Sequence, residues 1–322
     1  MRLSRPNGFT LVELLVAMLL GIVLSFGIVN VFIQSKADYS QDEELARMQE
    51  NARYALRLLS RELTLAGLTG YYSGIASSVT GTPTITNDCG TNWAVNISEA
   101  IAYTNNATAS PHSGCISDDD DIKDNTDVLV VRRTADDYSL DDGDENTGVT
   151  IDASGSDIKR VYMKKSGKDY SFIQGSSVTS GDTTSGSGVD LWEYYASVFF
   201  VRPYSDSGDG IPTLCISSLT STAQMKTNCY IEGVENFQLE FGIDSDGDGV
   251  ADQYKATATS AEVDSAVAVR VHLLMRSINT VPQYSNTKTY DLGNAVSNYT
   301  PSDKYYRRVY STTVILRNAD NA

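Results

Sequence analysis

Residues 9–33 read FTLVELLVAMLLGIVLSFGIVNVFI, and Glu13 is the only charged side chain among these 25 residues. The run contains no proline. At about 1.5 Å of rise per residue, a helix of this length spans roughly 37 Å, enough to cross the hydrocarbon core of a bilayer with some tilt. The stretch therefore predicts a membrane-spanning helix.

The segment before this helix is short and basic. Residues 1–8 read MRLSRPNG and end in glycine, whereas an ordinary secretory signal peptide has a shorter apolar run and a small-residue cleavage site. Because Arg2 and Arg5 precede the apolar run, we expect the N-terminus to stay in the cytoplasm and the rest of the chain to face the other side. Residues 1–8 are interpreted as a leader peptide and residues 9–33 as the helix that follows it.

Glu13 is the unusual residue of this helix. A carboxylate inside an apolar span costs at least a few kcal/mol and marks a functional position by default. Glu13 is the fifth residue counted from Phe9, so a cut between Gly8 and Phe9 would place a new α-amino group close to it. Among parallel helices, Glu13 of one subunit would pair with the Phe9 amine of its neighbour, which offsets the burial cost and fixes the axial register.

The stretch GFTLVEL, residues 8–14, resembles the class III signal of type IV pilins and type II secretion pseudopilins. The resemblance implies that a prepilin peptidase cuts after Gly8 and N-methylates Phe9, and that Glu13 acts in assembly. The chain departs from the family pattern at none of these positions.

The helix is expected to continue beyond the membrane over residues 34–68. Ser35 to Ala66 contains neither glycine nor proline, and Gly67 and Gly70 mark its end. Apolar residues recur at three- and four-residue steps, which predicts an amphipathic helix whose apolar stripe packs on the sheet that follows. These residues are Leu45, Met48, Ala52, Ala55, Leu59, Leu63 and Ala66.

Residues 69–322 change character and predict a β-rich periplasmic globular domain, with short β-branched runs between polar connections. A long N-terminal α-helix followed by strands is an α+β pattern, with the helix packed on an antiparallel sheet. The acidic or polar segments 118–121, 136–145 and 176–188 are interpreted as surface loops without a role. The predicted strands are 128–133, 158–164, 192–201, 237–243, 266–277 and 309–317.

Three C-terminal segments, together with the N-terminus, resemble the PilW family of minor pilins. They are GVENFQLEFG at 233–242, VRVHLLMRS at 269–277 and YRRVYSTTVILRN at 306–318. The resemblance implies a pilin-like fold and a structural subunit that primes type IV pilus assembly at or near the tip. It implies an inner-membrane protein with one span that later enters the extracellular pilus. The implied partners are other minor pilins, the major pilin, prepilin peptidase, the inner-membrane assembly platform and a PilY-type tip adhesin.

Two alternatives stay open beside this interpretation. A J-type pseudopilin of a type II secretion system has the same leader and a similar size. A calcium-dependent adhesion module at the filament tip would use the globular domain to bind a ligand.

The charge balance restricts the partners further. The chain carries 25 Lys and Arg against 41 Asp and Glu, a formal net charge of −16. This sign argues against nucleic acid or anionic lipid as a partner, because phosphate contacts need a basic surface. There are two histidines, His112 in a predicted loop and His272 in a predicted strand, and we find no nucleotide-binding, hydrolase or metalloprotease motif. We therefore expect no enzymatic activity.

The four cysteines lie far from the N-terminus, and none forms a CxxC pair. Four cysteines allow three pairings. For a domain outside the cytoplasm, the simplest choice joins sequence neighbours, Cys89 with Cys115 and Cys215 with Cys229.

An acidic loop, DSDGDGVAD over residues 244–252, has EF-hand-like spacing, with Gly249 at position 6, where such a loop turns sharply. Position 12 is Lys255 instead of a bidentate glutamate, so Glu262 or a carbonyl would have to complete the shell. The loop predicts calcium binding in the range of about 0.1–1 mM, and a solvated turn between two strands is the alternative. The predicted ligands are Asp244, Asp246, Asp248, the Val250 carbonyl and Asp252.

Overall fold

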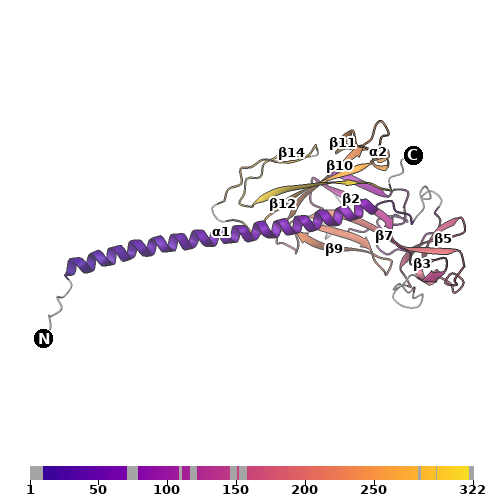
Figure 1. The fold of residues 1–322 in the computed structure, drawn as a ribbon, viewed down its shortest axis with the longest axis horizontal. Helices are drawn as coiled ribbons and strands as arrows, with labels where there is room; N and C mark the ends of the chain where they lie inside the picture. The colour runs from indigo at the N-terminus through magenta and orange to yellow at the C-terminus, as the bar shows by residue number, and fades with distance from the viewer. Residues whose placement is uncertain are drawn as a thin grey trace.

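The N-terminal part of the described chain is a single long helix. The computed structural model describes residues 10–70, 79–108, 111–116, 122–145, 151, 158–281, 284–294 and 296–318. Helix α1 (Leu11–Leu65) runs without interruption from the apolar run into the β-rich part and leaves its first half as a free stem (Figure 1). Among the described residues it is the one helix long and apolar enough to cross a membrane. The segments predicted on either side of residue 33 are therefore two halves of one helix.

The second half of α1 packs on the strands through the predicted stripe. Met48, Ala52, Ala55, Leu59 and Leu63 are all buried and belong to one core with residues of both large sheets. Their three- and four-residue spacing keeps them on one face of the helix. The stripe thus anchors the stem to the domain, as the sequence predicts.

Strand β7 organises the larger sheet. Its C-terminal half pairs antiparallel with β2 and β8, and its N-terminal end pairs with β3 and β5. Strands β1, β9, β4 and β6 complete this sheet outside those neighbours. The nine strands found in the described residues are β1 (Ile101–Ala107), β2 (Thr126–Thr134), β3 (Leu140–Asp141), β4 (Asp144–Glu145), β5 (Val161–Ser166), β6 (Asp169–Gln174), β7 (Val189–Arg202), β8 (Thr213–Leu219) and β9 (Met225–Glu232).

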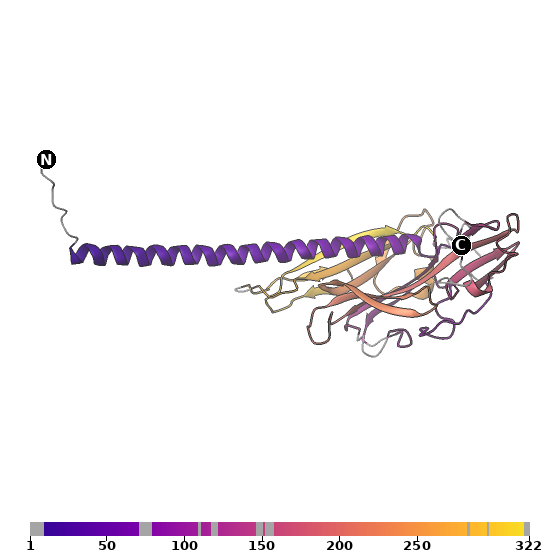
Figure 2. The same ribbon diagram turned by 90° about the horizontal axis from the view of Figure 1, so that it is seen from below.

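The second sheet has the antiparallel order β11-β10-β12-β15. The second half of α1 runs along the β-rich part (Figure 2). The inner faces of the two large sheets and this half of α1 share one hydrophobic core. A short hairpin of β13 and β14 packs on the other face of the second sheet, where Leu292 covers Leu274. The remaining elements are β10 (Val234–Ile243), β11 (Gln253–Lys255), β12 (Ala268–Arg276), β13 (Tyr290–Leu292), β14 (Val296–Tyr299), β15 (Arg307–Ile315), the 3-10 turn η2 (Gly175–Ser177) and the short helix α2 (Ser260–Asp264).

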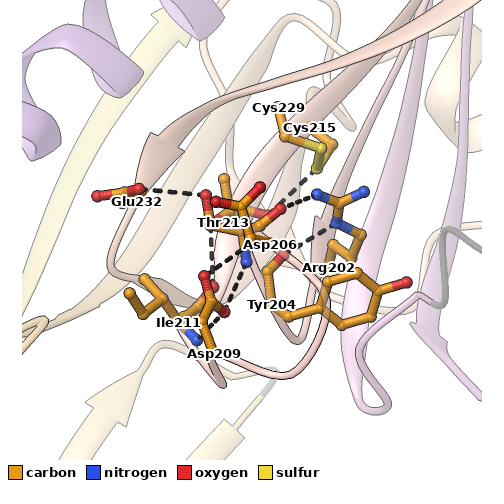
Figure 3. The surroundings of a disulfide bond; sticks show 10 residues. Arg202, Tyr204, Asp206, Asp209, Ile211, Thr213, Cys215, Cys229 and Glu232 are labelled. Atoms are coloured by element: carbon orange, nitrogen blue, oxygen red, sulfur yellow. Dashed lines mark hydrogen bonds between the residues drawn. A yellow bond between two sulfur atoms is a disulfide. The ribbon is translucent and has the colours of Figure 1, made fainter.

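The disulfides have the two pairings that the sequence favours. Cys215 and Cys229 face each other across β8 and β9 with 4.0 Å between their Cα atoms, and Figure 3 shows this bond. Cys89 is joined to Cys115, which ties down the segment that covers the outer face of the larger sheet. Beside the first bond, the Asp209 carboxylate accepts backbone N–H bonds from Ser205, Asp206 and Ile211, so it serves to close a turn.

Several predicted boundaries and one predicted loop differ from the structure. The strand predicted at 158–164 is β5, which begins at Val161 because the residues before it form a turn. The segment 136–145, predicted as a loop, contains β3 and β4, because the fully buried Leu140 pairs with Leu191 of β7. Segment 118–121 lies outside the described residues.

Candidate assembly and cation-binding sites

The first turn of α1 holds Glu13 in a capping box with Thr10. The Thr10 hydroxyl accepts a hydrogen bond from Glu13 N–H at 3.3 Å, and Glu13 Oε2 accepts bonds from Thr10 N–H and Oγ1, both at 2.9 Å. This arrangement satisfies backbone donors that a helix N-terminus leaves free. Glu13 therefore has a local partner before any neighbouring subunit arrives.

The capping box leaves one carboxylate oxygen available. Both bonds from Thr10 end at Oε2, and Oε1 has no donor among the described residues. A cationic group from another chain could therefore bind Oε1 without breaking the cap. Gly8 and Phe9, the predicted processing site, lie outside the described residues.

The stem beyond Glu13 is an apolar surface without a partner in the single chain. Every residue from Leu11 to Ile33 is exposed, and Leu11 reaches 76% and Phe26 70%. Soluble proteins rarely expose a continuous apolar surface of this size, so it must be covered by lipid or by other helices.

The acidic loop between β10 and β11 is preorganised by backbone hydrogen bonds. Asp244 Oδ1 accepts from Gly247 N–H and Oδ2 from Gly249 N–H, both at 2.7 Å, and these bonds hold the pKa of Asp244 below its ordinary value. Asp252 Oδ2 accepts from Ser245 N–H at 2.7 Å. Gly249 has a φ of +83°, a left-handed conformation that favours glycine.

Three of the four predicted carboxylates converge. Oxygen atoms of Asp244, Asp246 and Asp252 lie within 4.8 Å of one another, so a single cation could contact all three. Asp248 is not part of this group, and its carboxylate accepts the Val250 N–H at 2.8 Å. Glu262, one of the two candidates for completing the shell, forms an ion pair with Lys255 and belongs to the capping box of α2, and it is not among the three clustered carboxylates.

A buried polar cluster surrounds His272, which the sequence places in a strand, but its partners Glu240 and Ser311 were not singled out from the sequence. His272 on β12 contacts Glu240 through Nε2 at 2.9 Å and Ser311 through Nδ1 at 2.7 Å. Burial alone raises the pKa of Glu240, but hydrogen bonds from Asn294 N–H and His272 outweigh it and lower the pKa. A Cβ atom on Gly293 would lie 2.7 Å from the Glu240 carboxylate, so the hairpin needs glycine to close over this pair. The cluster fixes β13–β14 on the sheet.

Two further carboxylates connect distant elements. Glu44 of α1 accepts a bond from Ile278 N–H at 3.1 Å and one from the Asn279 side chain at 2.6 Å. Asp127 of β2 accepts from Asn106 N–H at 2.9 Å and from Leu239 N–H of β10 at 2.8 Å, which joins the two large sheets. Glu44 lies inside the predicted helix and Asp127 directly before the strand predicted at 128–133, and neither position by itself indicates these roles.

Two family models match separate parts of the chain. A family model described as Type IV Pilus-assembly protein W matches residues 198–318, and one described as Prokaryotic N-terminal methylation motif matches residues 3–29. A solved structure of a type IV-like pilin from Thermus thermophilus is 11% identical with a TM-score of 0.38, covering 85% of this chain and 98% of that one. No curated protein sequence matches the chain. The chain is therefore similar to type IV pilin-like proteins: a methylation-type motif matches residues 3–29, an exposed apolar helix follows it, and residues 198–318 match the PilW model.

Proposed function

We propose that this protein is a minor pilin that primes type IV pilus assembly and occupies a position at or near the pilus tip, without catalytic activity. The observation that carries the proposal is the free apolar stem of α1 with Glu13 as its single charge, joined to a PilW-type domain. A stem of this kind is stable only among lipids or other helices, and its carboxylate gives the packing a fixed register.

The mechanism we infer is templating. Prepilin peptidase would cut after Gly8 and expose the Phe9 amine, and Glu13 of an adjacent pilin would bind that amine through Oε1. The stem would leave the inner membrane by exchanging lipid for neighbouring stems, while the β-rich domain makes specific contacts with other minor pilins. The PilW match favours a pilus over a secretion pseudopilin, and loss of twitching motility instead of protein secretion on deletion would support that choice.

Replacing Glu13 with alanine is expected to lower incorporation into filaments by at least about tenfold, because it leaves the neighbour's amine buried without a partner. Membrane insertion should stay intact, since the substitution removes the only charge of the span. The amount of protein in sheared filaments and in the membrane fraction measures both effects.

Thr10→Val is the matched control, because it removes the hydroxyl of the capping box and keeps the carboxylate. If the two variants lose incorporation equally, Glu13 acts only as a helix cap. If the Glu13→Ala variant enters filaments normally, Glu13 does not fix the axial register of the packed helices.

We further propose that Asp244, Asp246 and Asp252 hold a calcium ion weakly. The convergence of their oxygens supports this, and the ion would relieve the repulsion among exposed carboxylates at the end of β10. A site with a Kd of about 1 mM would stabilise the domain by about 1.4 kcal/mol in 10 mM calcium, or roughly 3–6 °C in melting temperature.

The measurement is a thermal melt with and without calcium, on the chain from residue 36 onward, because residues 11–36 are exposed and contribute nothing to the core. Asp246→Asn should abolish the shift. Asp248→Asn should largely keep it, since Asp248 stands outside the cluster. An unchanged melting temperature and no heat on calcium titration would show an ordinary acidic turn.

A further inference from the structure

Two segments form the end of the globular domain that lies nearest the stem. One consists of residues 276–281 and 284–289, which begin at the end of β12, and the other of residues 300–308, which run into the start of β15 (Figures 1 and 2). The first is bound to α1 through Glu44, which accepts bonds from Ile278 and Asn279. The second places Tyr306 close to Asp38 of α1: burial, and then the negative charge of Asp38, raises the pKa of Tyr306. The two segments also bond to each other, through Ser277 N–H and the Tyr306 carbonyl at 2.8 Å.

The position of these segments along α1 sets their height above the membrane. Ile33 is the last residue of the apolar run, and Asp38 and Glu44 lie about 8 Å and about 16 Å further along the helix at 1.5 Å per residue. The headgroup layer on one side of a bilayer is roughly 5–8 Å thick. With the apolar run in the hydrocarbon, the level of Asp38 and Tyr306 coincides with the lipid headgroups.

The charge of the two segments differs from that of the whole chain. They contain five Lys and Arg residues and one acidic residue, whereas the chain has a formal net charge of −16. Arg307 and the acidic Asp303 pair with each other, and Arg307 also binds Glu235. At the headgroup level α1 contributes Lys36 and Asp38, whose formal charges cancel, and its acidic residues Asp42, Glu43 and Glu44 lie further from the apolar run. The cations left over are Arg276, Lys288, Lys304 and Arg308.

The same segments are rich in tyrosine. The rings of Tyr284 and Tyr306 lie 4.1 Å apart, and the Arg276 guanidinium stacks over Tyr305 at 4.1 Å. All three tyrosines are partly exposed, and Lys304 beside them is exposed. Tyrosine is enriched at membrane interfaces because its ring is apolar and its hydroxyl is polar, and Lys and Arg are attracted to anionic headgroups.

We propose that this basal surface, defined as Arg276, Tyr284, Lys288, Lys304, Tyr305, Tyr306 and Arg308, binds anionic phospholipid headgroups while α1 spans the inner membrane. The net charge of the whole chain does not indicate this basic surface, because the excess of acidic residues lies in other parts of the chain. The contact holds the domain against the bilayer until the subunit is extracted into a filament. The inference requires α1 to be inserted and is independent of a priming role.

The test places the full-length chain in nanodiscs, one copy per disc, and uses tryptophan reporters. Tyr306→Trp reports on the basal surface, and Phe26→Trp reports on insertion. Tyr54→Trp is the matched control, because it lies about 24 Å beyond Asp38 on α1. A lipid with a nitroxide on its headgroup quenches tryptophan at positions 306 and 54, and a lipid brominated in its acyl chains quenches tryptophan at position 26. The emission of the unsubstituted protein is subtracted from each measurement.

In discs that contain anionic lipid, we expect quenching at position 306 at least about twofold greater than at position 54. Discs made only of zwitterionic lipid should reduce this ratio of quenching. In the Lys288→Glu/Lys304→Glu variant, the ratio should be the same in both disc types. Equal quenching at positions 306 and 54, with Phe26→Trp quenched, would overturn the basal surface and leave the membrane anchor intact. If the protein that keeps Lys288 and Lys304 gives the same ratio of quenching at positions 306 and 54 in both disc types, anionic headgroups have no role. An unquenched Phe26→Trp would overturn this inference and the membrane-anchored pilin together.

Discussion

Replacing Arg307 with alanine is expected to lower the free energy of unfolding by about 3–5 kcal/mol, because it leaves a buried charge without its partner. The Arg307 side chain is 2% exposed and binds Glu235, which is 6% exposed, through two nitrogen atoms. It also donates two bonds of 2.6 Å to Asp303. Chemical denaturation of the chain from residue 36 onward measures the loss.

The control for this prediction replaces both partners with apolar residues, Arg307→Met/Glu235→Leu. The double variant should be clearly more stable than Arg307→Ala, because burying an apolar pair avoids the desolvation cost that an unpaired carboxylate leaves behind. If Arg307→Ala lowers the free energy of unfolding by less than 1 kcal/mol, the ion pair is solvated and does not stabilise the contact between β10 and β15 across β12.

The buried Asp127 should make the domain more stable at acidic pH. Burial raises the pKa of Asp127 from 3.8 to about 7, against the lowering effect of its bonds from Asn106 and Leu239 N–H. Because the folded-state pKa lies above the unfolded one, the contribution to stability is full below about pH 4 and is lost as the pH rises to about 7. The shift of about three pKa units corresponds to roughly 4 kcal/mol over that window.

Asp127→Asn isolates this effect from the other carboxylates, several of which have lowered pKa values and act with the opposite sign. The difference in unfolding free energy between the unsubstituted chain and the variant should shrink as the pH rises from 4 to 7 and then stay constant. The variant should be less stable at low pH, because its amide NH₂ faces a backbone N–H and leaves that donor unsatisfied. A difference independent of pH would show that Asp127 is ionised throughout this range.

The helix could be predicted because its signals are local. The uninterrupted run, the stripe through Leu59 and the glycine at position 67 each act within a few residues. The capping box of Thr10 and Glu13 is also encoded locally, as a threonine followed three residues later by a glutamate.

The strands were predicted where an apolar pattern was long, as in β7, β10 and β12. Strand β1 was missed because its polar sequence IAYTNNA depends on distant residues: Asp127 binds Asn106 N–H at the bulge, and Gln238 donates to the Asn106 side chain. Buried polar groups such as Asp127 and Arg307 could not be told from surface residues, because their partners lie on other strands. Asp248 fits the ligand spacing, and only the turn of the backbone directs it to Val250 N–H.

The most direct test of the central claim is mass spectrometry of purified filaments. If the protein is a processed minor pilin, filaments should contain it at low abundance, and its N-terminal peptide should begin Phe9-Thr10-Leu11-Val12-Glu13 with one added methyl group. Loss of Arg2 and Arg5 with the leader would take the formal net charge from −16 to −18. A chain that keeps Met1, begins at another residue, or stays in the membrane fraction and never enters filaments would contradict the account.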